Sequence, residues 1–157
     1  MANDLWETPQ YVFDWLNGEY HFNLDVAANA NNTKCFYWID ETLNALNVDW
    51  GGKKKNKCSL NPPYSDPYPW VKKAYEESQK GCTVVCLLPA DTSTKWFHDW
   101  VIGKAEIRLI QGRINFDNPT PGKYSAPKFG SMIAVYGPNV MPRVISVKRP
   151  DKPRKAI

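Results

Sequence analysis

Potential metal ligands are scarce in this sequence. It contains only two histidines, His21 and His98, and four cysteines, none of which forms a Cys-x-x-Cys pair. A structural zinc site needs four such ligands, usually in closely spaced pairs. The pattern therefore predicts no metal site. The cysteines lie in apolar or strand-like stretches, which favours reduced, mostly buried thiols in a cytoplasmic protein.

Long apolar runs and internal repeats are also absent. No stretch is long enough to span a bilayer, and the first residues lack a signal-peptide pattern. We therefore expect a cytoplasmic protein with no membrane partner. A length of 157 residues with 43% hydrophobic residues favours a single domain. We expect this domain over residues 1–141, followed by a basic tail over residues 142–157.

Basic residues are unevenly distributed along the chain. The predicted tail carries six lysines and arginines against one aspartate, and "KKKNK" at residues 53–57 forms a second basic cluster. The rest of the chain is nearly neutral. Two basic clusters on a neutral body suit a polyanionic partner such as nucleic acid. The alternative is a disordered, solvated tail and a solubilising loop.

Helical and strand-like stretches alternate along the chain. We predict helices over residues 8–17, 66–81 and 93–103, and strands within residues 21–28 (ending at Asp25) and over residues 57–60, 82–89, 105–110 and 130–136. Thr8 can cap the first helix and Ser93 the third. The apolar, β-branched run at 82–89 is typical of a strand buried on both faces of a parallel sheet. The alternation predicts an α/β sandwich around a mostly parallel sheet.

Polar residues follow three of the predicted strands. Asp25 ends the first strand, Asn61 follows the second, and Asp91 follows the third. In parallel sheets, ligands bind outside the carboxyl ends of the strands. If these strands are parallel, the three residues share one edge of the sheet.

The most unusual stretch is "SLNPPYSDPYPW" at residues 59–70, which holds four prolines and three aromatic residues. It is a poor helix and a poor strand interior, because proline lacks an amide donor and fixes φ. It is either a rigid turn or a segment that holds a polar group and a ring in a fixed pose.

Asn-Pro-Pro-Tyr after a buried strand resembles the catalytic motif of amino-group methyltransferases that use S-adenosylmethionine. The stretches "WETPQYVFDWL", "LDVAA", "LNALNVDW", "LLPADTSTKWF" and "GRINF" occur in the order typical of phage-type, Dam-like DNA N6-adenine methyltransferases. The resemblance spans about residues 6–136. It implies a Rossmann-like class I methyltransferase fold, a three-layer sandwich with one antiparallel strand near the C-terminus. It also implies S-adenosylmethionine as methyl donor and DNA as substrate.

Such a motif suits methylation of an adenine amino group. The lone pair of this nitrogen is delocalised into the ring, so two acceptors that hold its N–H groups would free the lone pair. Asn61 can supply its side-chain oxygen and Pro62 its carbonyl, while Pro63 stiffens the loop. Tyr64 offers a ring face for stacking a base, worth roughly 1–3 kcal/mol. The base must first leave the duplex, which costs a few kcal/mol.

The resemblance also implies a cofactor site around the first strand. Asp25 would accept a hydrogen bond from the amino group of the methionine moiety, and Asp40 or Glu41 would bind the ribose. The full predicted set is Trp6, Thr8, Pro9, Asp25, Ala27, Asp40, Asp49 and Asn61. Many related enzymes have a glycine-rich turn after the first-strand acid, whereas this chain has "DVAANANN". Small residues such as Ala27 still allow a close approach of a ligand.

The long segment at residues 111–129 is the best candidate for DNA contact, because structureless connections of this length are uncommon unless functional. Its basic residues can bind phosphates or bases, and its aromatic residues can wedge or stack. The predicted DNA-binding set is Lys53, Lys54, Lys55, Arg113, Phe116, Lys123, Tyr124 and Lys128. The alternative is a hairpin connection whose aromatic residues cover the edge of the core.

Three readings of function remain open at this point. The first is a site-specific DNA adenine methyltransferase. The second keeps the site but changes the acceptor to RNA adenine, cytosine N4 or a protein glutamine amide. The third is a non-catalytic nucleic-acid-binding protein on the same fold. The sequence leaves the choice between monomer and homodimer open.

Overall fold

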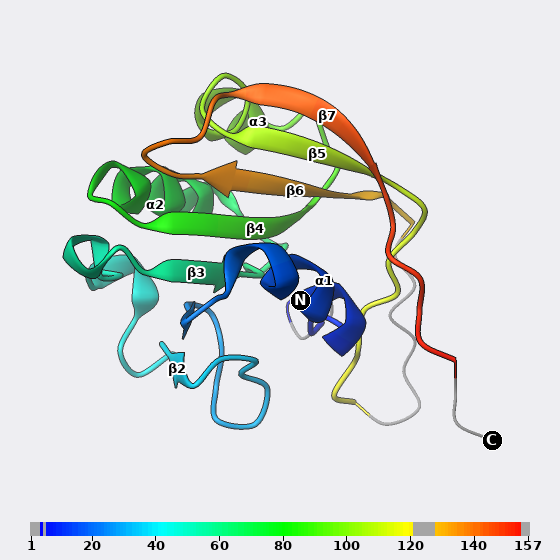
Figure 1. Ribbon diagram of the computed structural model, residues 1–157, viewed down its shortest axis with the longest axis horizontal. Helices are drawn as coiled ribbons and strands as arrows, with labels where there is room; N and C mark the ends of the chain where they lie inside the picture. The colour runs from blue at the N-terminus through cyan, green and yellow to red at the C-terminus, as the bar shows by residue number, and fades with distance from the viewer. Residues whose placement is uncertain (1–3, 5, 121–127, 155–157) are drawn as a thin grey trace.

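The computed structural model describes Asp4, residues 6–120 and residues 128–154. Its centre is a seven-stranded sheet in the order β2-β1-β3-β4-β6-β5-β7 (Figure 1). The strands are β1 (Leu24–Asp25), β2 (Tyr37–Trp38), β3 (Lys57–Leu60), β4 (Thr83–Pro89), β5 (Glu106–Gln111), β6 (Ser131–Tyr136) and β7 (Arg143–Lys148). Every pairing is parallel except those of β6, which runs antiparallel to β4 and β5. The predicted α/β class, with one antiparallel strand near the C-terminus, is confirmed.

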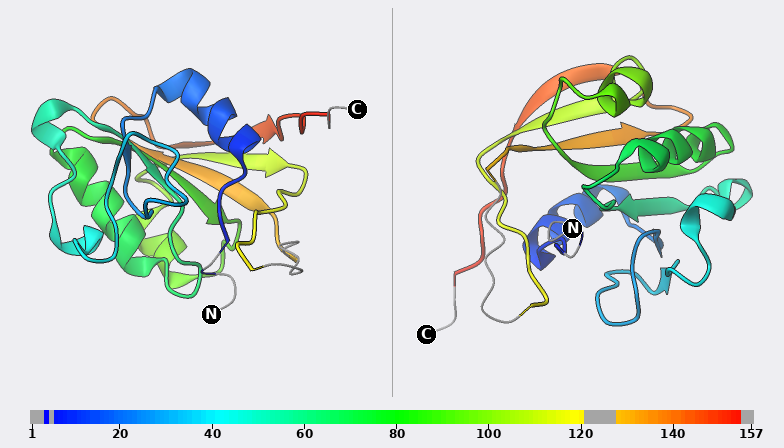
Figure 2. Two further views of the ribbon diagram at one scale, coloured as in Figure 1. Left: turned by 90° about the horizontal axis from the view of Figure 1, so that it is seen from below. Right: turned by 180° about the vertical axis from the view of Figure 1, so that it is seen from behind.

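Helices lie on both faces of this sheet (Figure 2). They are α1 (Gln10–Tyr20), α2 (Tyr68–Gln79) and α3 (Lys95–Trp100), with short 3-10 turns η2 (Ala45–Asn47) and η3 (Gly52–Lys54). Helices α2 and α3 pack with Val84, Cys86 and Leu88 of β4, whereas α1 packs with Val85 and Leu87. Strand β4 is therefore buried on both faces, as its apolar run predicts.

The first helix begins later than predicted. Its N-cap is Pro9, whose carbonyl accepts hydrogen bonds from the N–H groups of Val12 and Phe13, both at 3.1 Å. The prediction that Thr8 caps this helix is wrong. Pro9, whose backbone is extended, occupies the N-cap position, and Thr8 lies one residue before it. Thr94, rather than Ser93, similarly precedes α3.

Strand β7 is the main element that the sequence does not predict. It occupies residues 143–148 of the expected basic tail and pairs in parallel with β5. Val144, Ile145 and Val147 favour a strand, but the segment is basic and flanked by prolines, and as the last strand of the sheet it buries no continuous apolar face. Arg143 Nε donates to Glu106 Oε2 at 2.8 Å, which ties β7 to β5.

The long segment after β5 connects an antiparallel pair of strands, because β6 pairs with β5. Two predicted DNA contacts, Lys123 and Tyr124, fall outside the residues that the structure describes. All four cysteines are buried and free, as expected. Within the described ranges, no helix has the length and apolarity needed to cross a membrane.

Candidate functional site at the carboxyl edge of the sheet

The parallel strands bring two of the predicted site residues, Asp25 and Asn61, to one edge of the sheet. Asp25 of β1 is in register with Ser59 of β3, and Leu60 of β3 is in register with Cys86 of β4. Asn61, which follows β3, therefore lies at the same edge as Asp25. We call this the carboxyl edge, and the opposite side, where β3 and β4 begin, the amino edge. In Figure 1 the carboxyl edge is on the right.

Two oxygen atoms of the Asn-Pro-Pro-Tyr segment are available as acceptors. The Asn61 side chain donates from Nδ2 to the carbonyl of Trp6 at 3.2 Å, which fixes the orientation of its amide. Neither Asn61 Oδ1 nor the Pro62 carbonyl accepts a hydrogen bond from any residue in the described parts of the chain. Pro62 is buried, and the following proline restricts its backbone. Two unpaired acceptors therefore stand next to each other on a stiff loop.

Tyr64 belongs to an aromatic cluster beside these acceptors. Its hydroxyl donates to the Leu87 carbonyl at 3.1 Å, and burial raises its pKa well above the usual value. Its ring meets Phe116 edge-on at 5.8 Å and Phe129 at 6.0 Å. Trp6 stacks on Phe116 at 5.6 Å. This cluster joins the N-terminal segment, the Asn-Pro-Pro-Tyr loop and both ends of the long connection.

Asp25 is a buried carboxylate at the same edge. It is 9% exposed, and its Oδ2 accepts a hydrogen bond from the N–H of Lys34 at 3.2 Å. Burial raises the pKa of this carboxyl group, while the N–H groups of Lys34 and Ala27 partly oppose that effect. The charged form of Asp25 thus lacks a full set of partners, and a cationic ligand would stabilise it.

Asp40 lies next to the turn that follows Asp25. Strand β2 ends at Trp38, and the N–H of Ala28 donates to the Ile39 carbonyl at 3.2 Å. This contact brings the Ala27–Ala28 turn alongside Asp40. The Thr42 hydroxyl donates to Asp40 Oδ1 at 2.6 Å and is the main cause of its lowered pKa. Glu41 is exposed.

The predicted cofactor residue Asp49 is not brought to this edge. It lies ahead of β3, accepts a hydrogen bond from the N–H of Gly51 at 2.6 Å, and pairs with Lys80 at 3.7 Å. The Gly51 contact is the main cause of its lowered pKa. Trp50 is fully buried in the core, which matches the ordinary packing role considered for it.

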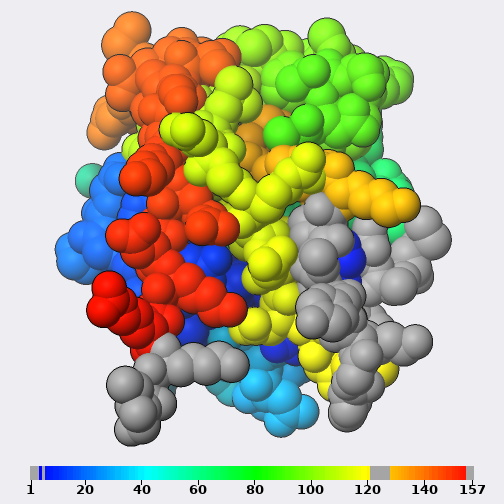
Figure 3. Space-filling view, turned by 90° about the vertical axis from the view of Figure 1, so that its right-hand side faces the viewer, coloured from blue at the N-terminus to red at the C-terminus, as the bar shows by residue number. Residues whose placement is uncertain are grey.

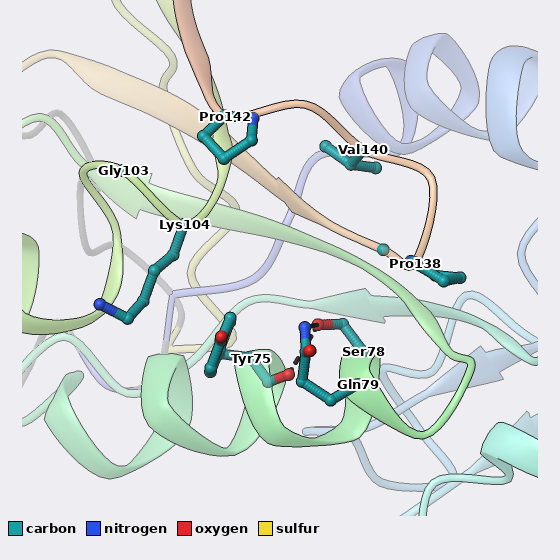
Figure 4. A pocket seen from close by; sticks show the side chains of 9 residues that line it. Tyr75, Ser78, Gln79, Gly103, Lys104, Pro138, Val140 and Pro142 are labelled. Atoms are coloured by element: carbon teal, nitrogen blue, oxygen red, sulfur yellow. Dashed lines mark hydrogen bonds between the residues drawn. The ribbon is translucent and has the colours of Figure 1, made fainter.

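The lysines of η3 are also separated from Asn61. Lys53, Lys54 and Lys55 precede the start of β3, so at ~3.3 Å per residue about 20 Å of extended chain separates Lys55 from Asn61. Two cavities lie at this amino edge, of about 340 and 490 Å³. Figure 4 shows the first, between α2 and the loop after β6. Lys55, Lys57 and Lys80 line the second.

The remaining predicted DNA contacts lie at the ends of the long connection. Arg113 and Lys128 are exposed, whereas Phe116 is 5% exposed and packs in the aromatic cluster. The burial of Phe116 agrees with the alternative that aromatic residues cover the core edge. Arg149 donates to the Arg113 carbonyl at 2.7 Å, so the basic C-terminal segment runs beside this connection (Figure 3).

Sequence reasoning missed the contacts of the N-terminal segment with the Asn-Pro-Pro-Tyr loop. Asp4 accepts hydrogen bonds from the N–H and the hydroxyl of Ser65, at 2.9 and 2.6 Å. Trp6 was predicted to be near the cofactor, but its carbonyl bonds Asn61 and its ring stacks on Phe116. No sequence signal reveals these pairs, because about sixty residues separate the partners.

Comparison with known proteins gives a consistent result. The sequence matches the protein family described as DNA N-6-adenine-methyltransferase (Dam) over residues 1–156. It is 41% identical to the DNA N-6-adenine-methyltransferase of Haemophilus phage HP1 (strain HP1c1) over 124 residues, which cover 76% of this chain and 70% of the relative. It is 40% identical to the DNA N-6-adenine-methyltransferase of Escherichia phage T1 over 117 residues, which cover 74% of this chain. The match spans only about half of that relative, 48% of its length.

Proposed function

We propose that this chain, which belongs to the DNA N-6-adenine-methyltransferase (Dam) family, transfers a methyl group from S-adenosylmethionine to the N6 amino group of a flipped adenine in DNA. Family membership agrees with the resemblance carried by the sequence motifs. We further infer a Rossmann-like class I methyltransferase fold, a three-layer sandwich, from the strand order and the helices on both faces of the sheet. If the chain is phage-encoded, as the two relatives named above are, it would act on DNA in the cytoplasm of a host cell.

The pair of unpaired acceptors at the carboxyl edge is the observation that carries this proposal. Asn61 Oδ1 and the Pro62 carbonyl would accept the two N–H groups of the target amine, drawing its lone pair out of the ring. Pro63 keeps both acceptors in place before substrate arrives. Tyr64 would stack against the extruded base. The freed lone pair would then face the methyl group that bound S-adenosylmethionine would supply, and the surplus proton of the amine would pass to water.

The residues of the carboxyl edge fit the cofactor. When bound, S-adenosylmethionine supplies an activated methyl group. Buried, incompletely partnered Asp25 suits its ammonium group, and Asp40 or Glu41 suits the ribose hydroxyls. In the described structure the Thr8 hydroxyl caps no helix and bonds no other residue, so it can serve the same ligand. We assign supporting contacts to Trp6, Pro9 and Ala27, but none to Asp49, which pairs with Lys80 at the other edge.

DNA would approach the carboxyl edge along the long connection. Exposed Arg113 and Lys128 suit phosphate contacts, and the C-terminal segment adds Arg149 beside them. Phe116 would support the base pocket from within the aromatic cluster. Lys53, Lys54 and Lys55 would contact only a part of the DNA remote from the target adenine.

Transfer of labelled methyl from S-adenosylmethionine tests this function. Unmodified DNA, RNA and protein are supplied in parallel, and digested nucleosides are analysed by mass spectrometry. We expect N6-methyladenine from DNA. Label in RNA, in cytosine or in protein would reassign the acceptor, and cofactor binding without any transfer would contradict catalysis.

A further inference from the structure

The segment that precedes α1 contacts the Asn-Pro-Pro-Tyr loop at two points. We call Asp4 and residues 6–9 the N-terminal strap. Asp4 holds Ser65, directly after Tyr64, through two hydrogen bonds of 2.9 and 2.6 Å. The Trp6 carbonyl holds the Asn61 amide nitrogen at 3.2 Å. The strap thus touches both ends of the loop that carries the two unpaired acceptors.

The strap is itself anchored to the long connection. Glu7 and Asp117 exchange two backbone hydrogen bonds, at 2.7 and 3.0 Å. The Trp6 ring packs on Phe116 and Phe129, at 5.6 and 6.2 Å. In the left view of Figure 2 the dark-blue segment before α1 runs beside the yellow part of this connection. The strap is therefore hydrogen-bonded to the long connection on one side and to the Asn-Pro-Pro-Tyr loop on the other.

The Trp6 contact decides which atom Asn61 presents. A primary amide has an acceptor oxygen and a donor NH₂ group, and rotation by half a turn exchanges them. With the NH₂ group held by the Trp6 carbonyl, Oδ1 is left for the substrate. In the opposite orientation Nδ2 would face the N–H groups of the target amine, and no hydrogen bond would form.

We propose that the N-terminal strap positions the catalytic loop: Asp4 clamps Ser65, and this clamp keeps Asn61 in the orientation that the Trp6 carbonyl selects. Asp4 and Ser65 are positioning residues, because neither touches the reacting atoms. The proposal rests on the proposed methyl transfer. The strap would act on turnover more than on binding, because the contact of Oδ1 with the amine strengthens as the nitrogen becomes tetrahedral.

The first test replaces Asp4 and Ser65 by alanine, singly and together. We expect kcat to fall about tenfold in Asp4→Ala, because displacing a catalytic group by an ångström costs up to ~100-fold. Dissociation constants for S-adenosylmethionine and DNA should change less than about twofold. Ser65→Ala should give a smaller loss, since the Ser65 N–H contact remains. The double variant should be no worse than Asp4→Ala, because both changes remove the same contact.

Two further variants distinguish a positioning role of Asp4 from a general effect of negative charge and from a loss of folding. Asp4→Asn keeps an acceptor for the Ser65 N–H and should restore most of kcat. Asp66→Asn removes a negative charge next to Ser65, at an exposed side chain that forms no hydrogen bond or ion pair within the described residues, and should leave kcat unchanged. Thermal unfolding of each variant identifies any that fail to fold. Equal losses in Asp4→Ala and Asp66→Asn would overturn the proposal in favour of a general charge effect.

A second readout does not depend on activity. The side-chain NH₂ of Asn61, assigned in a ¹⁵N spectrum from the peak pair that Asn61→Asp removes, should exchange slowly in the unaltered protein and faster in Asp4→Ala. Unchanged exchange together with unchanged kcat would refute the strap. If the unaltered protein methylates nothing, the proposed function fails, and the exchange comparison alone still decides whether the strap holds Asn61.

Discussion

The two edges of the sheet differ in how their polar groups are paired. At the amino edge several charged groups are paired with one another: Lys80 pairs with Asp49 and Glu77, and Lys73 reaches Glu77 at 2.7 Å. At the carboxyl edge Asn61 Oδ1 and the Pro62 carbonyl have no partner in the described structure. The two cavities described above and the lysine cluster lie at the amino edge.

Under the proposed function, the reacting groups lie at the carboxyl edge, away from the lysine cluster and from the two cavities described above. The exposed pair of Lys80 and Asp49 contributes little to stability. Acceptors held on a stiff loop without partners cost free energy in the folded state, and a substrate with two N–H groups recovers it. The comparison predicts that changes at the carboxyl edge affect turnover, and that changes at the amino edge do not.

Substitution of Asn61 should have the largest effect. Asn61→Ala removes one of the two acceptors, so we expect methyl transfer to fall by at least about a hundredfold, as for loss of a donor from an oxyanion hole. DNA affinity should remain, because the acceptor binds one amino group only. Single-turnover rates and a DNA-binding titration measure both quantities. A variant that binds DNA and still methylates it at the original rate would contradict the assignment of the methyl-transfer site to the carboxyl edge.

Substitution of Tyr64 should have the second-largest effect on methyl transfer. Tyr64→Ala removes the stacking surface, worth about 1–3 kcal/mol per base, so we expect kcat/KM to fall by roughly 5- to 150-fold. Tyr64→Phe keeps the ring and loses only the hydrogen bond to the Leu87 carbonyl, which costs about 1 kcal/mol of folding stability. Steady-state kinetics and thermal unfolding distinguish the two. Equal kinetic losses in both variants would mean that the hydroxyl, not the ring face, matters.

Asp25 should show opposite effects on binding and stability. Burial raises its pKa, so the protonated form stabilises the fold at low pH, and that stability is lost as pH rises through the raised pKa. Asp25→Asn avoids this loss, so its melting temperature should match the unaltered protein at acid pH and exceed it at neutral pH. Its affinity for S-adenosylmethionine should fall about tenfold.

Calorimetric titration and melting curves across pH measure both effects of Asp25→Asn. Equal affinity for the cofactor would remove Asp25 from the cofactor site, whereas a lower melting temperature at neutral pH would mean that the charged carboxylate stabilises the fold.

The basic residues should give the smallest effects and the most direct comparison. Arg113→Ala and Lys128→Ala should each weaken binding to a short duplex by a few-fold and lower the salt dependence by about one phosphate contact. Changing Lys53, Lys54 and Lys55 together should alter this binding by less than about twofold, although it removes more charge. A binding series over salt concentration tests this. A larger effect of the amino-edge triple variant would place the DNA at both edges.

Much of the fold follows from local patterns in the sequence. The apolar run at 82–89 appears as β4, and the stretch at 57–60 is β3 with the predicted bounds. Strand β7 was not predicted. It is the last strand of the sheet and pairs with β5 alone, and its segment is basic and flanked by two prolines. Strand β1 is only two residues long, since backbone pairing rather than apolar composition sets its ends.

The sequence by itself determined the chemistry that this protein can offer: Asn-Pro-Pro-Tyr after a buried strand, and an acid at the end of another. Only the tertiary structure decided which residues share the site. The parallel register placed Asp25 at the same edge as Asn61 and left Asp49 and the lysines of η3 at the far edge. It also brought Asp4 and Trp6 onto the Asn-Pro-Pro-Tyr loop. Contacts between distant segments depend on how the elements pack, and that arrangement has no local signature in the chain.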